Sequence, residues 1–234
     1  MRKNFVKYAE DLLDGCILKQ KTRRKVCNMD NVGGYWDALY SDGAHVDASY
    51  DGWLDTFRDV LARAGRVLEL GAGDGADTGF LRSACASVLS CDFSDAALIC
   101  LKHRYPGAET MRLDLTEPMV FGKGTFEAVV ADLCLHYFPL QKTREIFTEL
   151  HRVLAPGGWL FLRVNAREEY VPAPEDVRLE TDYYVTRGCA RRYFSKEELE
   201  ALLSGFRIVR LQRDSTGKYG ARKHMWMAAA VREE

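Results

Sequence analysis

Residues 66–75 read RVLELGAGDG, a short apolar segment followed by a loop with glycines at 71, 73 and 75. About 20 residues further along, the run SVLSCDF (87–93) places Asp92 at the end of a second apolar segment. In a parallel α/β sheet, such glycines let a ligand approach the backbone closely, and an acid at the next strand end accepts hydrogen bonds from ribose hydroxyls. Together, the two segments predict a site for a nucleoside cofactor.

Apolar segments that predict strands alternate with segments that predict helices from residue 66 onward. Strands are expected at 66–70, 87–93, 109–115, 126–135 and 159–164, and helices at 76–85, 95–104 and 140–154. Another helix is expected after Ser195, and the segments 206–212 and 225–231 leave no room for a helix between them. The expected fold is therefore α/β, with a doubly wound, mostly parallel sheet of seven strands that ends in an antiparallel C-terminal hairpin.

Four residues with candidate roles lie at the ends of expected strands. Gly71, Asp92, Asp114 and Asp132 each lie at the carboxyl end of one. Ligands of doubly wound sheets bind beyond these ends, where the strand order reverses. We therefore expect the four residues to share one rim of the sheet.

Composition narrows the possible compartments and partners. The chain has 234 residues and a net charge of −1, which provides no overall field that would favour nucleic acid or an anionic membrane. Apolar runs stay well below the roughly 20 residues needed to span a bilayer. The seven cysteines form no CxxC pair, which favours a reducing, cytoplasmic environment with mostly buried thiols and no metal site. Oligomeric state is not readable from the sequence.

Two segments fall outside the alternating pattern. Residues 1–57 are expected to form a helical arm or lid before a domain at 58–234, and residues 166–194 a lid insertion within that domain. The arm contains an expected amphipathic helix with Phe5, Tyr8, Leu12 and Leu13. Two basic clusters, at 19–25 and 218–224, are expected to be exposed to solvent.

The ordered motifs resemble those of class I S-adenosylmethionine-dependent methyltransferases of the small-molecule type. LELGAGDG is similar to the glycine loop of the family, and CDFSDAAL, RLDL and FEAVVADLCLHYF are similar to the segments that follow it. LHRVLAPGGWLFLRV is similar to the helix–turn–strand segment of the family, and KHMWMAAAV to its final strand. The resemblance covers roughly residues 60–232, and YWDALY (35–40) is like an element that covers the cofactor in relatives.

The resemblance implies S-adenosyl-L-methionine as cofactor, S-adenosyl-L-homocysteine as product and a small-molecule acceptor. The residues that it implies for the cofactor site are Tyr40, Gly71, Ala72, Gly73, Asp92, Phe93, Ser94, Asp114, Leu115, Asp132 and Leu133. A carboxylate such as Asp92 suits the ribose diol, and an aromatic ring such as Phe93 suits the adenine face. Asp114, or the amide of Leu115, is expected at the adenine edge.

His136 follows the fourth expected strand, where the acceptor would approach, and it is the candidate general base. The alternative is that it only shapes the floor of the pocket. Other functions also remain open, because residues 71–76 match GxGxxA, which is typical of nicotinamide-dependent oxidoreductases. A binding module without catalysis, and a methyltransferase acting on RNA or protein, are further alternatives.

Overall fold

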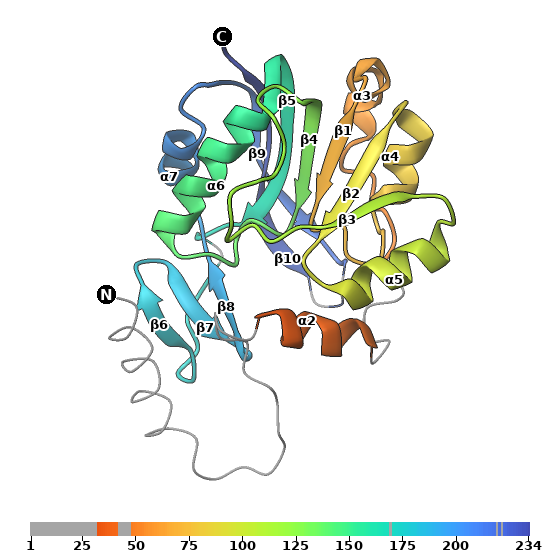
Figure 1. The fold of residues 1–234 in the computed structure, drawn as a ribbon. Coiled ribbons are helices and arrows are strands. Elements are labelled where there is room, and N and C mark those ends of the chain that lie inside the picture. Colours follow the sequence, from red (N-terminus) through yellow and green to blue (C-terminus); the bar gives the residue numbers. More distant parts are fainter. Residues whose placement is uncertain (1–31, 42–47, 169, 219, 221) are drawn as a thin grey trace.

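The computed structural model describes residues 32–41, 48–168, 170–218, 220 and 222–234. Its centre is a seven-stranded sheet with the strand order β3-β2-β1-β4-β5-β10-β9 (Figure 1). The strands are β1 (Val67–Leu70), β2 (Val88–Asp92), β3 (Glu109–Arg112), β4 (Phe126–Asp132), β5 (Leu154–Asn165), β9 (Phe206–Thr216) and β10 (Lys223–Arg232). The pairs are parallel except those of β10, which runs antiparallel to β5 and β9. This confirms the expected sheet and its C-terminal hairpin.

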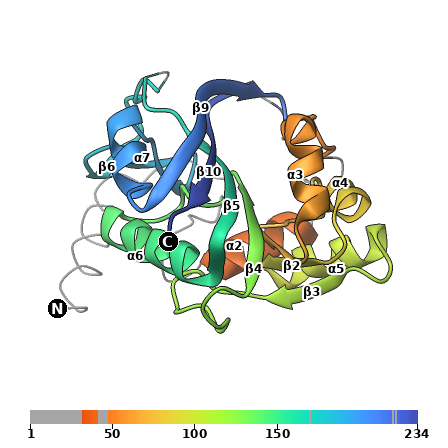
Figure 2. The same ribbon diagram turned by 90° about the horizontal axis from the view of Figure 1, so that it is seen from above.

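Helices cover both faces of this sheet (Figure 2). A short 3-10 turn, η1 (Asp55–Phe57), leads into α3 (Arg58–Arg63), which lies with α4 (Thr78–Ala84) and α5 (Asp95–Arg104) on one face. α6 (Leu140–Val153) and α7 (Lys196–Leu202) cover the other face. The sheet is therefore the middle of three layers, as a doubly wound fold requires.

The continuous apolar run of β4 follows from this burial on both faces. Val129 and Ala131 belong to the hydrophobic cluster under α6 and α7, whereas Ala128 and Val130 belong to the cluster under α3 and α4. Successive side chains of a strand point to opposite faces, so a strand covered on both sides is apolar throughout.

Serine hydroxyls cap the first turns of two helices. The hydroxyl of Ser94 accepts a hydrogen bond from the amide of Ala97 at the start of α5, and Ser195 accepts one from Glu198 at the start of α7. Each cap satisfies an amide that has no partner within the first turn of its helix.

The strand ends at the ligand-binding rim differ from expectation in two places. β4 ends at Asp132 rather than at residue 135, because Leu133 adopts a positive φ of 54° and turns the chain. β3 ends at Arg112 rather than at residue 115, and Asp114 lies in a turn in which its carboxylate accepts hydrogen bonds from the amide and hydroxyl of Thr116.

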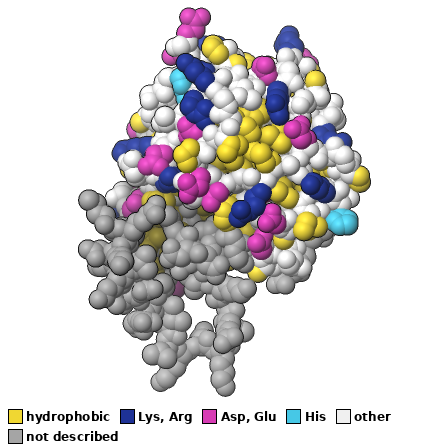
Figure 3. All heavy atoms as spheres, in the orientation of Figure 1, with side chains coloured by type: hydrophobic (Ala, Val, Ile, Leu, Met, Phe, Trp, Pro, Cys, Tyr) yellow, Lys and Arg dark blue, Asp and Glu magenta, His cyan; other side chains and the backbone are white. Residues whose placement is uncertain are grey.

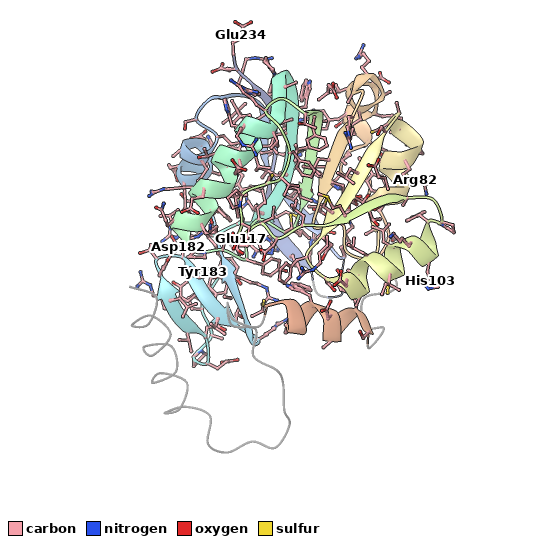
Figure 4. The ribbon with its side chains drawn as sticks, in the orientation of Figure 1. Arg82, His103, Glu117, Asp182, Tyr183 and Glu234 are labelled. Atoms are coloured by element: carbon pink, nitrogen blue, oxygen red, sulfur yellow. The ribbon has the colours of Figure 1, made fainter. Side chains whose placement is uncertain are left out.

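The insertion at 166–194 contains a second sheet that the sequence did not predict. β6 (Val177–Glu180), β7 (Tyr183–Thr186) and β8 (Cys189–Arg192) pair in antiparallel order. The chain leaves the main sheet after Asn165 and returns beside it at Phe194, whose amide bonds the Asn165 carbonyl at 2.9 Å. Figure 4 labels Tyr183 where this small sheet meets the main domain, and its hydroxyl donates to the carbonyl of Tyr137 at 3.0 Å.

Helix α2 (Val32–Ser41) packs against α5 and lies below the carboxyl ends of the parallel strands in Figure 1. The hydrophobic core extends N-terminally to Trp53, Leu54 and Phe57, which pack with residues of α3 and β5. Packing therefore continues across residue 57, and the division into an arm at 1–57 and a domain at 58–234 stays a prediction. The expected amphipathic helix with Phe5 and the basic run 19–25 lie outside the described residues.

Charged side chains of both signs are interspersed over the described part of the face shown in Figure 3. This distribution agrees with the net charge of −1. No helix of the described ranges is both long and apolar enough to cross a membrane.

Candidate functional site

A cavity of about 270 Å³ opens at the carboxyl ends of the parallel strands. This is close to the lower limit of about 300 Å³ for sites that bind small molecules. Its walls come from α2, the glycine loop, the segments after β2, β3 and β4, and the ends of β8 and β10. Eight of the predicted cofactor residues line it: Tyr40, Gly71, Asp92, Phe93, Asp114, Leu115, Asp132 and Leu133.

The other three predicted cofactor residues support this wall from behind. The amide of Gly73 donates to one carboxylate oxygen of Asp92 at 2.9 Å, and the amide of Ser94 donates to the other at 2.9 Å. Ala72 is buried, and its amide bonds the carbonyl of Cys91 at 3.0 Å. These contacts fix the orientation of the Asp92 carboxylate at the cavity wall.

Asp92 has the chemistry that a ribose diol requires. Burial raises the pKa of its carboxyl group, against the effect of the amides of Ser94 and Gly73, which lower it. A carboxylate has about four acceptor positions, so two amide bonds leave capacity for further donors. Phe93 lies beside it, and the guanidinium of Arg112 lies 5.0 Å from the centre of that ring. The residues present therefore fit a nucleoside with a flat base.

Two glycines of the glycine loop lie too close to neighbouring side chains to carry a side chain of their own. Gly71 has a φ of +65°, and a Cβ there would lie 2.3 Å from the Cβ of Cys134. Gly73 has a φ of +56°, and a Cβ there would lie 2.5 Å from the hydroxyl of Tyr40. Both positions combine a left-handed backbone with a close neighbour, so neither accepts a side chain without displacement.

Tyr40 brings a neutral hydroxyl from α2 to the glycine loop. Burial raises the pKa of Tyr40, and the nearby carboxylates of Asp92 and Asp74 raise it further. The phenol therefore keeps its proton at neutral pH and can donate a hydrogen bond to an anionic ligand group.

Asp132 is held by cations rather than presented free to the cavity. Its carboxylate forms two hydrogen bonds with the guanidinium of Arg163, at 2.6 and 2.9 Å, and one with the ammonium of Lys218 at 2.8 Å. Burial opposes ionisation, but these two charges lower the pKa of Asp132 below its usual value. Lys218 also bonds Asp77 at 2.6 Å, and Arg163 bonds Asp51.

This network corrects one expectation about the basic cluster 218–224. Lys218 was expected to be exposed, but it is only 6% exposed and reaches back from the β9–β10 connection to two buried carboxylates. Lys223, at the start of β10, is half-buried and lines the cavity. The basic cluster did not predict this burial, because Lys218 pairs with carboxylates far away in the sequence and Lys223 faces a cavity built by distant segments.

A second buried carboxyl group lies behind the glycine loop. Glu69 accepts hydrogen bonds from the hydroxyls of Ser90 at 2.6 Å and Thr78 at 2.7 Å. Burial raises the pKa of Glu69 to about 8, although both hydroxyls lower it. Glu69 therefore stays protonated at neutral pH and ties β1 to β2 and α4.

His136 is not part of the cavity lining. It is 3% exposed, and its ring lies 4.5 Å from that of Tyr137, which does line the cavity. Burial lowers the pKa of His136 well below its usual value, and the charges of Lys223 and Arg191 lower it further. The imidazole is therefore neutral at pH 7, and its role as general base stays a prediction.

Cys134 packs against the glycine loop with a protonated thiol. Its sulfur lies 3.3 Å from the carbonyl of Leu70, and burial raises its pKa well above the usual value. Among the described residues, no group of three or more His, Cys, Asp or Glu side chains could hold a metal ion.

Comparison with known proteins agrees with this geometry. Residues 68–162 match the sequence profile of the family described as "Methyltransferase domain". This range runs from β1, the strand before the glycine loop, to β5. Residues 68–162 are therefore similar to a methyltransferase domain.

Curated relatives of this methyltransferase domain match over part of their length. An uncharacterized methyltransferase of Synechocystis sp. is 36% identical over 93 residues, which are 40% of this chain and 43% of the relative. A demethylmenaquinone methyltransferase of Clavibacter sepedonicus is 33% identical over 134 residues, 56% of this chain and 52% of the relative. The chain thus spans about half the length of the curated relatives that it matches.

Solved structures share the fold of the methyltransferase domain. A 1,6-didemethyltoxoflavin-N1-methyltransferase of Burkholderia thailandensis superposes with a TM-score of 0.69 at 22% identity, covering 88% of each chain. A S-adenosylmethionine-dependent methyltransferase of Methanosarcina mazei gives a TM-score of 0.64 at 20% identity, covering 72% of this chain and 92% of that one. The match of residues 68–162 to a methyltransferase family favours the methyltransferase interpretation over the oxidoreductase alternative.

The structure also brings residues to the site that were not among the predicted cofactor residues. Tyr35 and Trp36 of α2, Tyr137 after β4, Arg191 of β8 and Lys223 of β10 all line the cavity. The sequence suggested six residues of the insertion as possible acceptor-pocket residues: Tyr183, Tyr184, Arg187, Arg191, Arg192 and Tyr193. Of these six, only Arg191 lines this cavity, and the small sheet that carries it has no strong pattern in the sequence.

Proposed function

We propose that this protein transfers a methyl group from S-adenosylmethionine to a small-molecule acceptor. The observation that carries this proposal is a single cavity that joins two kinds of wall. One wall consists of the glycine loop, Asp92 and Phe93, and the other consists of aromatic and cationic residues from α2, β8 and β10. The first wall suits a nucleoside, and the second offers aromatic and cationic contacts to an acceptor.

The residues of the first wall would hold the cofactor in the following way. Asp92 would accept the ribose hydroxyls, Phe93 and Leu115 would enclose the adenine, and Asp114 would face its amino group. Gly71 and Leu133 would present backbone groups to the amino-acid tail, and the neutral hydroxyl of Tyr40 would donate to its carboxylate. When bound, the cofactor supplies an electrophilic methyl group on a sulfonium, whose sulfur keeps the bonding electron pair as the acceptor's lone pair bonds the carbon.

Alignment is the main contribution of the protein to such a displacement. Holding two reactants in line can supply roughly 7–11 kcal/mol of the barrier. Leu133, at the turn after β4, and Tyr137 both line the cavity, and they would set the direction of approach. If the acceptor carries a proton on its nucleophilic atom, His136 is the proposed base, and this role requires its ring to move to the cavity, which it does not line here.

A small acceptor is favoured over a macromolecule by the enclosure of the cavity. Helix α2 borders it with four lining residues, and β8 of the small sheet contributes Arg191. Two relatives have names that specify small acceptors, demethylmenaquinone and 1,6-didemethyltoxoflavin. We further propose a cytoplasmic location, because all five cysteines of the described residues are free thiols.

Calorimetry with S-adenosylhomocysteine tests this proposal directly. The wild-type protein is expected to bind it, and Asp92→Ala is expected to weaken binding by about 1.5–3 kcal/mol, the scale for hydrogen bonds to a charged group. Asp95→Ala is the matched control, since this acid lies three residues away, is exposed and is not part of the cavity lining. Unchanged affinity in Asp92→Ala would show that the ribose does not bind there.

A further inference from the structure

The charged residues of the cavity are divided between its two ends. Asp92 ends β2 and Asp114 follows β3, whereas Arg191 and Lys223 come from β8 and β10. In the sheet order, β2 and β10 are four strand spacings apart, about 19 Å at roughly 4.8 Å for each spacing. The cationic end therefore lies on the far side of the strand-order reversal from the ribose and adenine residues.

The two cations of this end repel each other across a partly buried space. Burial lowers the pKa of Lys223, and the charge of Arg191 lowers it further. Asp132, the lining carboxylate between the two ends, has a smaller, opposite effect on Lys223, and it already binds Arg163 and Lys218. An additional anion in the cavity would offset this repulsion.

Arg191 is held in place to receive such an anion. One guanidinium nitrogen donates to the carbonyl of Thr186 at 2.8 Å, within the β7–β8 hairpin. Its carbon lies 5.9 Å from the centre of the Tyr137 ring. A fixed guanidinium loses little conformational freedom when it binds a carboxylate or phosphate through its planar fork.

Aromatic rings form the walls next to these cations. Tyr35, Trp36, Tyr137 and Phe138 all line the cavity. The rings of Trp36 and Tyr137 have centres 5.2 Å apart and planes inclined by 76°, so one presents its face where the other presents its edge. Such walls favour a flat ring, because faces and edges of aromatic groups attract each other in these arrangements.

We propose that the methyl acceptor is a small planar compound with an anionic group, a carboxylate or phosphate, that pairs with Arg191 and Lys223. This inference rests on the proposed function and specifies its acceptor. Arg191 would bind two oxygens of the anion, Lys223 would contribute a second charge, and the ring would lie against Trp36 and Tyr137.

The test compares matched anionic and neutral aromatic compounds on protein saturated with S-adenosylhomocysteine. The probes are 4-hydroxybenzoate with 4-hydroxybenzamide, indole-3-carboxylate with indole-3-carboxamide, and phenyl phosphate with phenol, each by thermal shift and calorimetry. We expect at least one anion to bind about tenfold or more tightly than its neutral partner, the change expected for a charge-assisted contact. The benzoate and phosphate arms distinguish the two anionic groups.

Variants of Arg191 and Lys223 test whether these two cations cause the preference for anionic over neutral compounds. Arg191→Gln and Lys223→Gln are expected to abolish the preference for the anion, and Arg191→Lys and Lys223→Arg are expected to retain part of it. Arg178→Gln is the control, because Arg178 is an exposed arginine of the same small sheet and is not part of the cavity lining.

Three results would overturn this inference. The first is equal or tighter binding of the neutral partners, and the second is no binding by any of the three anions. The third is that the glutamine variants lose affinity for S-adenosylhomocysteine but not for 5′-methylthioadenosine, which lacks the amino-acid tail. That result would assign the cations to the carboxylate of the cofactor. Failure of the wild-type protein to bind S-adenosylhomocysteine would instead refute the proposed function itself.

Discussion

Gly73→Ala tests whether helix α2 rests on the glycine loop. A methyl group at this position meets two obstacles, the left-handed backbone with a φ of +56° and the hydroxyl of Tyr40 at 2.5 Å. The backbone contributes about 1–2 kcal/mol of destabilisation for a residue with a Cβ. Displacement of Tyr40 adds about 1–3 kcal/mol, the usual range for an overpacked site. The expected total is about 2–5 kcal/mol, which lowers the melting temperature by roughly 2–4 °C for each kcal/mol in a chain of this size.

Two further variants separate these contributions. Gly107→Ala is the matched control for the backbone, because Gly107 has a φ of +83° and no atom within 4 Å of an added Cβ. Tyr40→Phe removes the hydroxyl and leaves the ring carbon 3.4 Å from the added Cβ, a tight but tolerable contact. In the Tyr40→Phe background, Gly73→Ala should therefore destabilise no more than Gly107→Ala does.

Urea unfolding of the wild type, Gly73→Ala, Tyr40→Phe and the double variant measures the coupling between residues 40 and 73. The reasoning requires a coupling free energy of about 1 kcal/mol or more between residues 40 and 73, which is typical of residues in contact. The same effect of Gly73→Ala in both backgrounds would refute it, and would mean that Tyr40 does not cover the loop.

Other perturbations test the buried charges of the site. Folded Glu69 keeps its proton between about pH 4.5 and 8, so its contribution to stability is full below pH 4.5 and is lost as pH rises through 8. The free energy of unfolding of the wild type relative to Glu69→Gln, measured with urea, should therefore fall between pH 5 and 9. A difference that does not change with pH would contradict the protonated state. Lys218→Met leaves Asp77 and Asp132 without their shared ammonium, so it should lower the free energy of unfolding in urea by about 3–5 kcal/mol. Adding Asp77→Asn should restore part of this stability, and no recovery would contradict the network. His136→Gln should lower turnover more than cofactor affinity if the imidazole is a base, whereas equal losses in both would make it a packing residue.

The main sheet and its binding rim were predictable because local signals and the global fold agree. Val129 and Val130 face opposite layers, so the apolar run of β4 marks a strand covered on both sides. The glycine loop and Asp92 lie where the spacing of the motifs predicted them. The serines at 94 and 195 cap their helices because a hydroxyl before a helical segment satisfies an otherwise unpaired amide.

The small sheet and the burial of Lys218 were not predictable, because the strands are short and the partners of Lys218 are distant in the sequence. The strands of the small sheet have only four residues each, and two-residue turns at Thr181–Asp182 and Arg187–Gly188 connect them. Lys218 reads as part of an exposed basic cluster, since its partner Asp77 is 141 positions away in the sequence. No local pattern distinguishes such a buried lysine from a solvated one.

The insertion begins and ends at neighbouring points of the main sheet, and this has a consequence for the evolution of the protein. Asn165 and Phe194 are joined by a hydrogen bond, and Ala166 pairs with Phe194 in an isolated bridge. A segment whose two ends already meet can be exchanged for one of different length without moving β5 or α7. Arg191, the proposed acceptor contact within this insertion, can therefore be replaced together with its small sheet, while the strands that hold the nucleoside stay unchanged.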